Sequence, residues 1–210
     1  MWIDLTMPIT PSMPTNPDHV APTFAPYARL EEVGWEATHV TLSSHTGTHM
    51  DAPSHFVPGA PTIDRVPIDL FTGPAQVIHL SDIHDGQAIG REQLPDISSS
   101  RVLLCTGWPA RASDHDAFFG RHPYLTEDAA DYLLRSGVRL VGIDSPSVDY
   151  HPPSAVHVAL LGAGTLIVEN LVNLTQLGAE CEFSVFPLLL VTLDGSPVRA
   201  IATISDGSKA

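Results

Sequence analysis

Three histidines and one aspartate lie within eleven consecutive residues, and all four are types that bind divalent metal ions. They are His45, His49, Asp51 and His55. Zinc and similar ions take imidazole nitrogen and carboxylate oxygen at about 2.0–2.2 Å, usually from three protein ligands in a catalytic site. The residues between them are small or turn-forming and bury little apolar surface, so core packing explains the segment poorly. The sequence therefore predicts a metal site here.

The backbone of this segment determines which side chains converge. A helix would place His45 and His49 on one face, but Gly47 and its β-branched neighbours disfavour a helix. In an extended segment, His49 and Asp51 point to the same side. Gly47 would let the chain turn so that His45 joins them. We therefore expect a strand that ends in a loop around an ion. Two threonines are expected to support the ligands through hydrogen bonds, Thr46 and Thr48.

The elements that hold this segment are short strands alternating with a few helices. Six prolines between positions 8 and 26 predict an extended loop after the first strand. The predicted strands are Trp2–Leu5, Glu36–Leu42, Ala75–His79, Arg101–Thr106, Leu140–Asp144, Gly164–Val168, Glu182–Leu190 and Val198–Ile204. The predicted helices are Gly90–Leu94, Thr126–Gly137 and Pro153–Leu161. Since a helix, a glycine and a buried strand in succession form half of a βαβ unit, we expect an α/β fold with a mixed sheet.

Length and charge restrict the class of protein further. The 210 residues are expected to form a single domain over 1–210, and 43% hydrophobic against 16% charged residues predict a large core. Ten Lys and Arg against 24 Asp and Glu give a formal charge of -14, which disfavours nucleic acid and anionic membranes as partners. Two distant cysteines, a start without a basic region and no long apolar stretch favour a cytoplasmic protein.

The segment from His45 to Phe56 resembles the signature of the cyclase-like metal-dependent hydrolases, the family of bacterial kynurenine formamidase and isatin hydrolase. The similarity extends over nearly the whole chain. It begins at Trp2-Ile3-Asp4-Leu5, continues through Leu104-Cys105-Thr106-Gly107-Trp108 and Gly142-Ile143-Asp144-Ser145-Pro146-Ser147-Val148-Asp149, and ends at Ser196-Pro197-Val198-Arg199-Ala200. The resemblance implies a swivelling β/β/α fold, a homodimer or higher homo-oligomer, and one or two Zn²⁺ or Mn²⁺ ions per subunit.

The resemblance also assigns roles to residues. It implies metal ligation by His45, His49, Asp51, His157 and Glu169, with Asp51 bridging. His55 matches the general acid/base. The implied activity is hydrolysis of an amide, formamide or lactam C–N bond in a small molecule by water that the ion activates. A non-catalytic or regulatory metal-binding member and a cyclase or lactonase-type enzyme remain as alternatives. A serine hydrolase built on Ser145 is disfavoured because the Gly-x-Ser-x-Gly turn is missing.

The substrate-binding residues are less well defined by the sequence. Where formamidases of the family carry a substrate-stacking tryptophan, this chain has Asn16, which predicts a smaller or more polar substrate. Asn16 and Phe56 are the candidate substrate contacts, and Phe24, Trp35 and Trp108 are further candidates for pocket walls or core. The other seven histidines are interpreted as surface or core residues, although His19 and His151 lie in loops that could reach a substrate.

Overall fold

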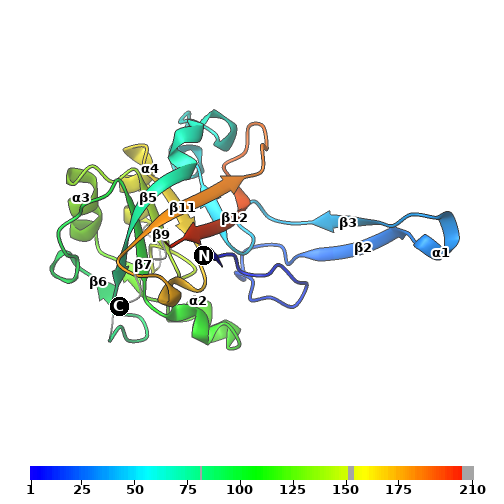
Figure 1. Ribbon diagram of the computed structural model, residues 1–210, viewed down its shortest axis with the longest axis horizontal. Helices are drawn as coiled ribbons and strands as arrows, with labels where there is room; N and C mark the ends of the chain where they lie inside the picture. Colours follow the sequence, from blue (N-terminus) through cyan, green and yellow to red (C-terminus); the bar gives the residue numbers. More distant parts are fainter. Residues whose placement is uncertain (81, 151–153, 205–210) are drawn as a thin grey trace.

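A computed structural model describes residues 1–80, 82–150 and 154–204, and its centre is one eight-stranded sheet (Figure 1). The strand order is β1-β12-β11-β5-β7-β9-β10-β4. The strands are β1 (Trp2–Asp4), β4 (His49–Asp51), β5 (Thr72–His79), β7 (Arg101–Cys105), β9 (Leu140–Ile143), β10 (Leu166–Glu169), β11 (Glu180–Pro187) and β12 (Gly195–Thr203). Two two-stranded sheets lie outside it, β2 (Thr23–Ala28) with β3 (Ala37–Thr41) and β6 (Ala88–Ile89) with β8 (Tyr124–Leu125).

The sheet mixes parallel and antiparallel strands and closes on itself. Strand β5 pairs in parallel with β7, β7 with β9, and β9 with β10. The short strand β4 lies antiparallel to both β10 and β12 and so closes the sheet between these two strands, with β1 left as an edge strand on β12. The α/β class with a mixed sheet, expected from the sequence, is confirmed. The closing strand β4 is also the strand that carries His49 and Asp51.

Apolar residues on the two faces of the sheet form two separate cores. Along β7, Val102 and Leu104 pack with helices α3 (Glu127–Arg135) and α4 (Ala155–Gly162), whereas Leu103 and Cys105 pack inside the closed sheet. This alternation is the two-residue period of a strand that is buried on both faces. Both cysteines are free and buried. Among the described helices, none is long and apolar enough to cross a membrane.

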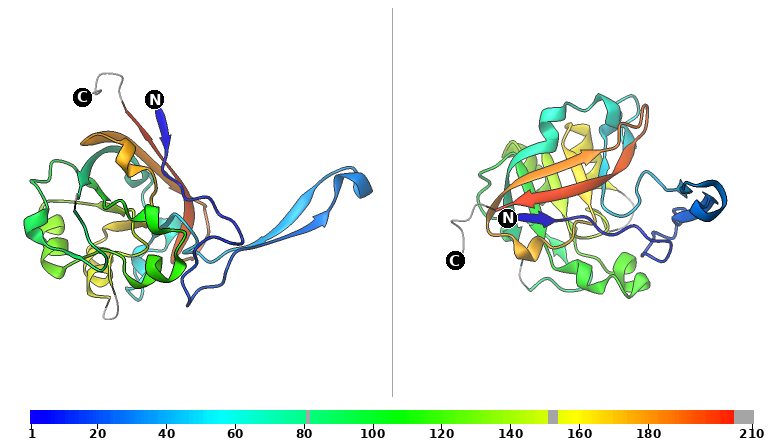
Figure 2. Two further views of the ribbon diagram at one scale, coloured as in Figure 1. Left: turned by 90° about the horizontal axis from the view of Figure 1, so that it is seen from below. Right: turned by 45° about the vertical axis from the view of Figure 1, so that its right-hand side comes forward.

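Strands β2 and β3 form an arm that projects from the body, with the short helix α1 (Leu30–Val33) at its tip (Figures 1 and 2). The prediction of an extended loop over the first prolines was wrong for β2. Pro26 lies within that strand, and it is tolerated because a two-stranded hairpin leaves backbone N–H groups unpaired on its outer edge. Phe24 and Trp35 are exposed on this arm and line neither core nor pocket.

The other predicted elements agree with the structure to within a few residues, with one exception. The helix predicted at Gly90–Leu94 is only a single 3₁₀ turn, Arg91–Gln93, because Gly90 and Leu94 on either side of it have extended backbone conformations. Thr126 caps α3 by accepting a hydrogen bond from the backbone N–H of Ala129. Helix α2 (His115–Gly120) was not predicted. Pro153, the predicted start of the third helix, lies outside the described residues.

Candidate metal centre

Strand β4 brings His49 and Asp51 to one side, and the turn before it adds His45. Gly47 has φ +62°, a left-handed conformation that glycine adopts without a steric penalty, so the chain reverses as the sequence predicted. The Nδ1 atom of His45 lies 2.8 Å from Oδ1 of Asp51. The Nε2 atom of His49 lies 3.4 Å from the same oxygen. These three residues are therefore grouped by local backbone geometry.

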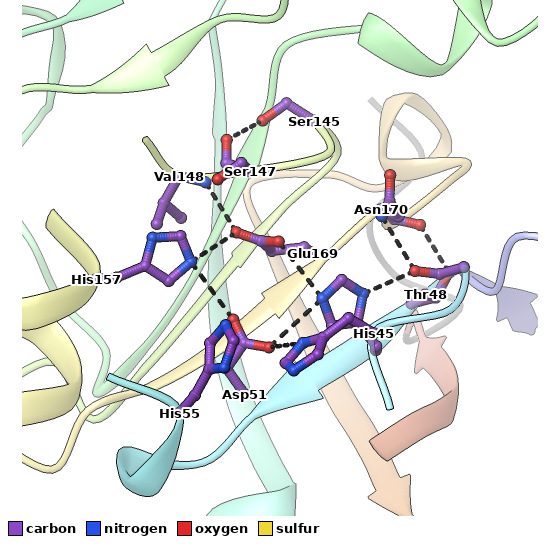
Figure 3. Close-up of polar contacts among 12 residues, drawn as sticks. His45, Thr48, Asp51, His55, Ser145, Ser147, Val148, His157, Glu169 and Asn170 are labelled. Carbon is purple, nitrogen blue, oxygen red and sulfur yellow. Dashed lines mark hydrogen bonds and ion pairs between the residues drawn. The ribbon is translucent and has the colours of Figure 1, made fainter. Parts of the chain in front are cut away.

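His157 and Glu169 reach the same point from helix α4 and strand β10. Antiparallel pairing places Glu169 directly opposite His49, and the two side chains approach to 3.4 Å. Nε2 of His157 lies 3.5 Å from Asp51 and 3.3 Å from Glu169 (Figure 3). The structure thus brings together all five residues that the resemblance implied as ligands, although they come from positions up to 124 residues apart (45 to 169).

The arrangement of these five side chains fits divalent ions. Two overlapping groups have ligand atoms within 4.8 Å of one another, and Asp51 belongs to both of them. Two ligand atoms on a tetrahedral zinc ion lie about 3.4 Å apart, given bonds of about 2.1 Å, and four of the nitrogen–oxygen distances above are 3.3–3.5 Å. Asp51 is 1% exposed, and among the described residues neither of its carboxylate oxygens has an aligned hydrogen-bond donor. The groups are His45, His49 and Asp51, and Asp51, His157 and Glu169.

Each of the three histidines in these groups has one ring nitrogen held by an acceptor outside the centre. Nδ1 of His49 lies 2.8 Å from the carbonyl oxygen of Gly47. Nδ1 of His157 lies 2.7 Å from Oδ2 of Asp149. Nε2 of His45 lies 2.8 Å from Oδ2 of Asp194. A partner of this kind fixes the orientation of the ring and leaves the second nitrogen directed at the centre.

Without an ion, histidines and carboxylates of the centre stabilise one another's charged forms. Burial opposes the charged form of His45, but Asp51 and Asp194 outweigh this effect and raise its pKa to about 9. Burial likewise opposes ionisation of Glu169, but His157 and His49 lower its pKa to about 2. The pKa of His157 is raised, because Asp149, Asp51 and Glu169 outweigh its burial. A divalent ion would therefore compete with protons for these nitrogens.

His55 lies beside the centre at the wall of a pocket of about 350 Å³. Its ring centroid is 4.1 Å from that of His45, and its side chain is 25% exposed. Burial lowers the pKa of His55, and the neighbouring rings of His45 and His157 lower it further, although Asp51 opposes them. Its neutral form therefore predominates at neutral pH, as a residue that accepts a proton requires.

Both candidate substrate contacts line this pocket. Asn16 lies in the loop before the arm, and Phe56 packs against the rings of His55 and His157, with centroids 4.5 and 4.7 Å apart. His19 also lines the pocket, with its ring centroid 5.8 Å from that of His45. His151 lies outside the described residues. Trp108 is buried in a core cluster with Phe118 and not in the pocket.

The supporting residues differ from those expected. Thr46 accepts a hydrogen bond from the backbone of Ser43, and Thr48 donates to the backbone oxygen of Asn170. The threonines thus fix the backbone, and no hydrogen bond from either to a ligand side chain occurs among the described residues. Sequence reasoning missed Asp149 and Asp194. Asp149 closes one of the motifs quoted above and Asp194 stands two residues before another, so their positions were the available signal.

Comparison with known proteins places this chain among several similar ones. Residues 3–150 match a family model described as "Putative cyclase". The chain is 34% identical over 206 residues to a kynurenine formamidase of Geobacillus thermodenitrificans, with 95% of each chain covered. The structure of isatin hydrolase A from Labrenzia aggregata superposes with a TM-score of 0.87 at 26% identity, covering 98% of this chain and 94% of that one. A potential metal-dependent hydrolase with cyclase activity superposes with a TM-score of 0.82 at 28% identity, covering 96% of both.

Proposed function

Because the chain belongs to the cyclase family of metal-dependent hydrolases, we propose that it cleaves the C–N bond of a small amide, formamide or lactam. The observation that carries this proposal is the convergence of three histidines and two carboxylates on one buried point at the floor of a pocket. His55 stands beside that point, and simply holding an ion does not require it. Its presence supports an enzyme over a protein that only binds metal.

The proposed cofactor is Zn²⁺ or Mn²⁺, with one or two ions per subunit. One ion would be held by His45, His49 and Asp51, and a second by Asp51, His157 and Glu169. Imidazole nitrogens with carboxylate oxygens suit both metals. Such an ion, when bound, lowers the pKa of water and polarises a carbonyl oxygen.

The chain's own contribution to the reaction is proton transfer and orientation. His55, neutral at neutral pH, accepts a proton from the attacking water and returns it to the leaving nitrogen. The pocket lining also contains Asn16 and His19, which offer hydrogen bonds to a polar substrate. Phe56 supplies an apolar contact next to His55. The volume of about 350 Å³ suits a small molecule.

The test is a hydrolysis screen of aryl formamides, lactams, lactones and esters with Zn²⁺, Mn²⁺ or no metal. We expect turnover of a C–N substrate only with metal. The variant His55→Ala should retain metal and lose about 10²–10⁴-fold in rate, whereas His84→Ala, at an exposed histidine outside the pocket, should lose neither. Equal rates with and without metal would refute the proposal. Turnover confined to lactones or esters would favour the alternative of a lactonase-type enzyme.

We further propose a homodimer or higher homo-oligomer that buries the β2–β3 arm against a second copy. A two-stranded hairpin is at best marginally stable in water, yet this one exposes six large apolar side chains by 42–69%. They are Phe24, Tyr27, Leu30, Val33, Trp35 and Val40. Light scattering should show an oligomer, and Trp35→Ser with Leu30→Ser should dissociate it. The cytoplasmic location and the exclusion of nucleic-acid and membrane partners remain predictions from the sequence.

A further inference from the structure

Asp194 lies at the entrance to strand β12, where its backbone is fixed relative to the metal-binding segment. The N–H of Ala52 donates to the carbonyl oxygen of Asp194 at 2.9 Å, and the N–H of Ile63 donates to that of Leu193 at 2.9 Å. The next residue, Gly195, pairs directly with Asp51 across β12 and β4. The position of Asp194 is therefore set by the same strand pairing that closes the sheet.

One carboxylate oxygen of Asp194 lies near two histidines with different proposed roles. Its Oδ2 atom is 2.8 Å from Nε2 of His45 and 3.3 Å from Nδ1 of His55. Its Oδ1 atom accepts a hydrogen bond from the hydroxyl of Ser44 at 3.1 Å, which turns Oδ2 toward the rings. The two rings are close and tilted, with centroids 4.1 Å apart and an angle of 31° between their planes. A single carboxylate thus contacts both a proposed ligand and the proposed acid/base.

The space for this arrangement depends on the glycine that follows. A Cβ atom on Gly195 would lie 2.7 Å from the backbone oxygen of Met50 and 3.1 Å from Cε1 of His45. Both contacts are shorter than normal van der Waals distances, so a side chain here would displace the His45 ring or separate β12 from β4. Asp194 and Gly195 together therefore define where the ring of His45 lies.

We propose that Asp194 is a positioning residue that holds His45 as a metal ligand and His55 as a base, an inference that rests on the proposed function. A carboxylate accepts hydrogen bonds only, so the ring nitrogen that faces it carries the proton. His45 then donates from Nε2 and directs the lone pair of Nδ1 at the centre. By the same argument the proton of His55 is placed on Nδ1, the nitrogen 3.3 Å from Asp194, so its Nε2 is free to take a proton from water and pass it to the leaving nitrogen, while Asp194 stays ionised.

The competing assignment is that Asp194 is itself a ligand. His45, His55 and Asp194 also offer ligand atoms within 4.8 Å of one another. The positioning role is favoured because the other two proposed histidine ligands each have an equivalent outer partner, Gly47 for His49 and Asp149 for His157. With Asp194 as the partner of His45, each of the three histidine ligands has one ring nitrogen held by an acceptor outside the centre and the other directed at it.

The test is Asp194→Asn, measured by histidine-ring ¹⁵N NMR and by competition with a chelator for Zn²⁺. The asparagine has the same shape but no charge, so its amide oxygen at the Oδ2 position is a weaker acceptor for both rings than the carboxylate, and its NH₂ group faces the Ser44 hydroxyl. In the zinc-loaded parent we expect His55 Nδ1 to be protonated and free of metal. In D194N we expect the signals of His45 and His55 to change and those of His49 and His157 to stay. Zinc affinity should fall about 10–100-fold at unchanged stoichiometry.

Kinetics add a readout that a purely structural role would not change. In D194N, kcat should fall while KM stays within about two-fold, because the substrate contacts remain in place. The matched control is Asp64→Asn, which removes the charge of the carboxylate that accepts from the N–H of Thr192 at 3.0 Å in the same connection but touches neither histidine. If D194N does not fold, Ser44→Ala removes only the hydrogen bond to Oδ1 and should produce the same changes in smaller degree.

Three results would overturn the inference. They are zinc bound to His55 Nδ1 in the parent, loss of one zinc equivalent in D194N, and NMR signals and affinity in D194N equal to those of the parent. None of them requires a known substrate. The inference can therefore fail while metal-dependent hydrolysis holds, and hydrolysis can fail while the ring assignments hold.

Discussion

Replacing Asp51 by asparagine should abolish the stabilisation of this protein by metal. Asp51 is the residue common to both proposed ligand groups, and it is 1% exposed. The asparagine side chain has nearly the same volume but is neutral, and one of its two terminal atoms is a donor and cannot bind a cation. Since both groups lose their shared carboxylate, we expect D51N to hold neither ion at the micromolar concentrations that load the parent.

The size of the effect follows from linkage. An ion present at about 1,000 times its dissociation constant stabilises the folded state by about 4.1 kcal/mol. For a domain of 150–250 residues, 1 kcal/mol shifts Tm by about 2–4 °C, so zinc should raise the Tm of the parent by about 8–16 °C. In D51N the shift should fall below about 2 °C. Metal content by mass spectrometry should fall in parallel.

The quantity to compare is the rise in Tm that zinc causes in each protein, because the metal-free parent and metal-free D51N will also differ in Tm. In the parent without metal, Asp51 offsets the charges of His45 and His157, which lie 2.8 and 3.5 Å away. Removing one partner from a buried set of charges costs about 3–5 kcal/mol, so metal-free D51N should melt at a lower temperature than the metal-free parent. Asp131→Asn, at an exposed carboxylate on α3, is the control. A D51N protein that binds both ions and keeps the full zinc shift would refute the shared-ligand model.

Two further predictions concern the metal-free protein and its core. Because the pKa of His45 is raised to about 9 from an ordinary 6.5, its stabilising contribution is complete below pH 6.5 and is lost as the pH rises through 9. Glu169, lowered to about 2 from 4.5, contributes above pH 4.5 and loses its contribution toward pH 2, so urea unfolding should show maximal stability between pH 4.5 and 6.5. A flat profile would contradict the charge pairing. Gly142→Ala would place a Cβ 2.6 Å from Leu103 and 2.7 Å from Leu171, so it should cost about 1–3 kcal/mol in the same assay.

The sequence predicts the convergence of those ligands of the centre that lie close together along the chain. His49 and Asp51 alternate along an extended segment, and Gly47 marks the turn, so their convergence follows from backbone periodicity alone. His157 and Glu169 could be assigned only through the family resemblance. Their approach depends on the pairing of β10 with β4, and register between strands more than a hundred residues apart is not encoded in a local pattern.

The same distinction explains what the sequence did not show. Asp149 and Asp194 lie in loops, and a single aspartate in a loop is usually a solvated surface residue. Their importance depends on a partner brought near by the fold, the ring of His157 for Asp149 and that of His45 for Asp194. The arm is a related case. Its prolines suggested a loop, and only the pairing of β2 with β3 reveals a hairpin whose large apolar residues stay 42–69% exposed.

The position of the centre at the closure of the sheet links metal binding to the fold. Strand β4 is only three residues long, yet it joins β10 to β12 and carries two proposed ligands. Glu169 enters from β10 and Asp194 from the residue just before β12, so the side chains around the centre come from, or from next to, the three strands that meet there. An ion held between β4 and β10 would therefore strengthen a pairing of only three residue pairs. Loss of metal should loosen this closure before it affects the parallel strands β5, β7 and β9, and amide hydrogen exchange at residues 49–51 and 195–197 should increase first when metal is removed.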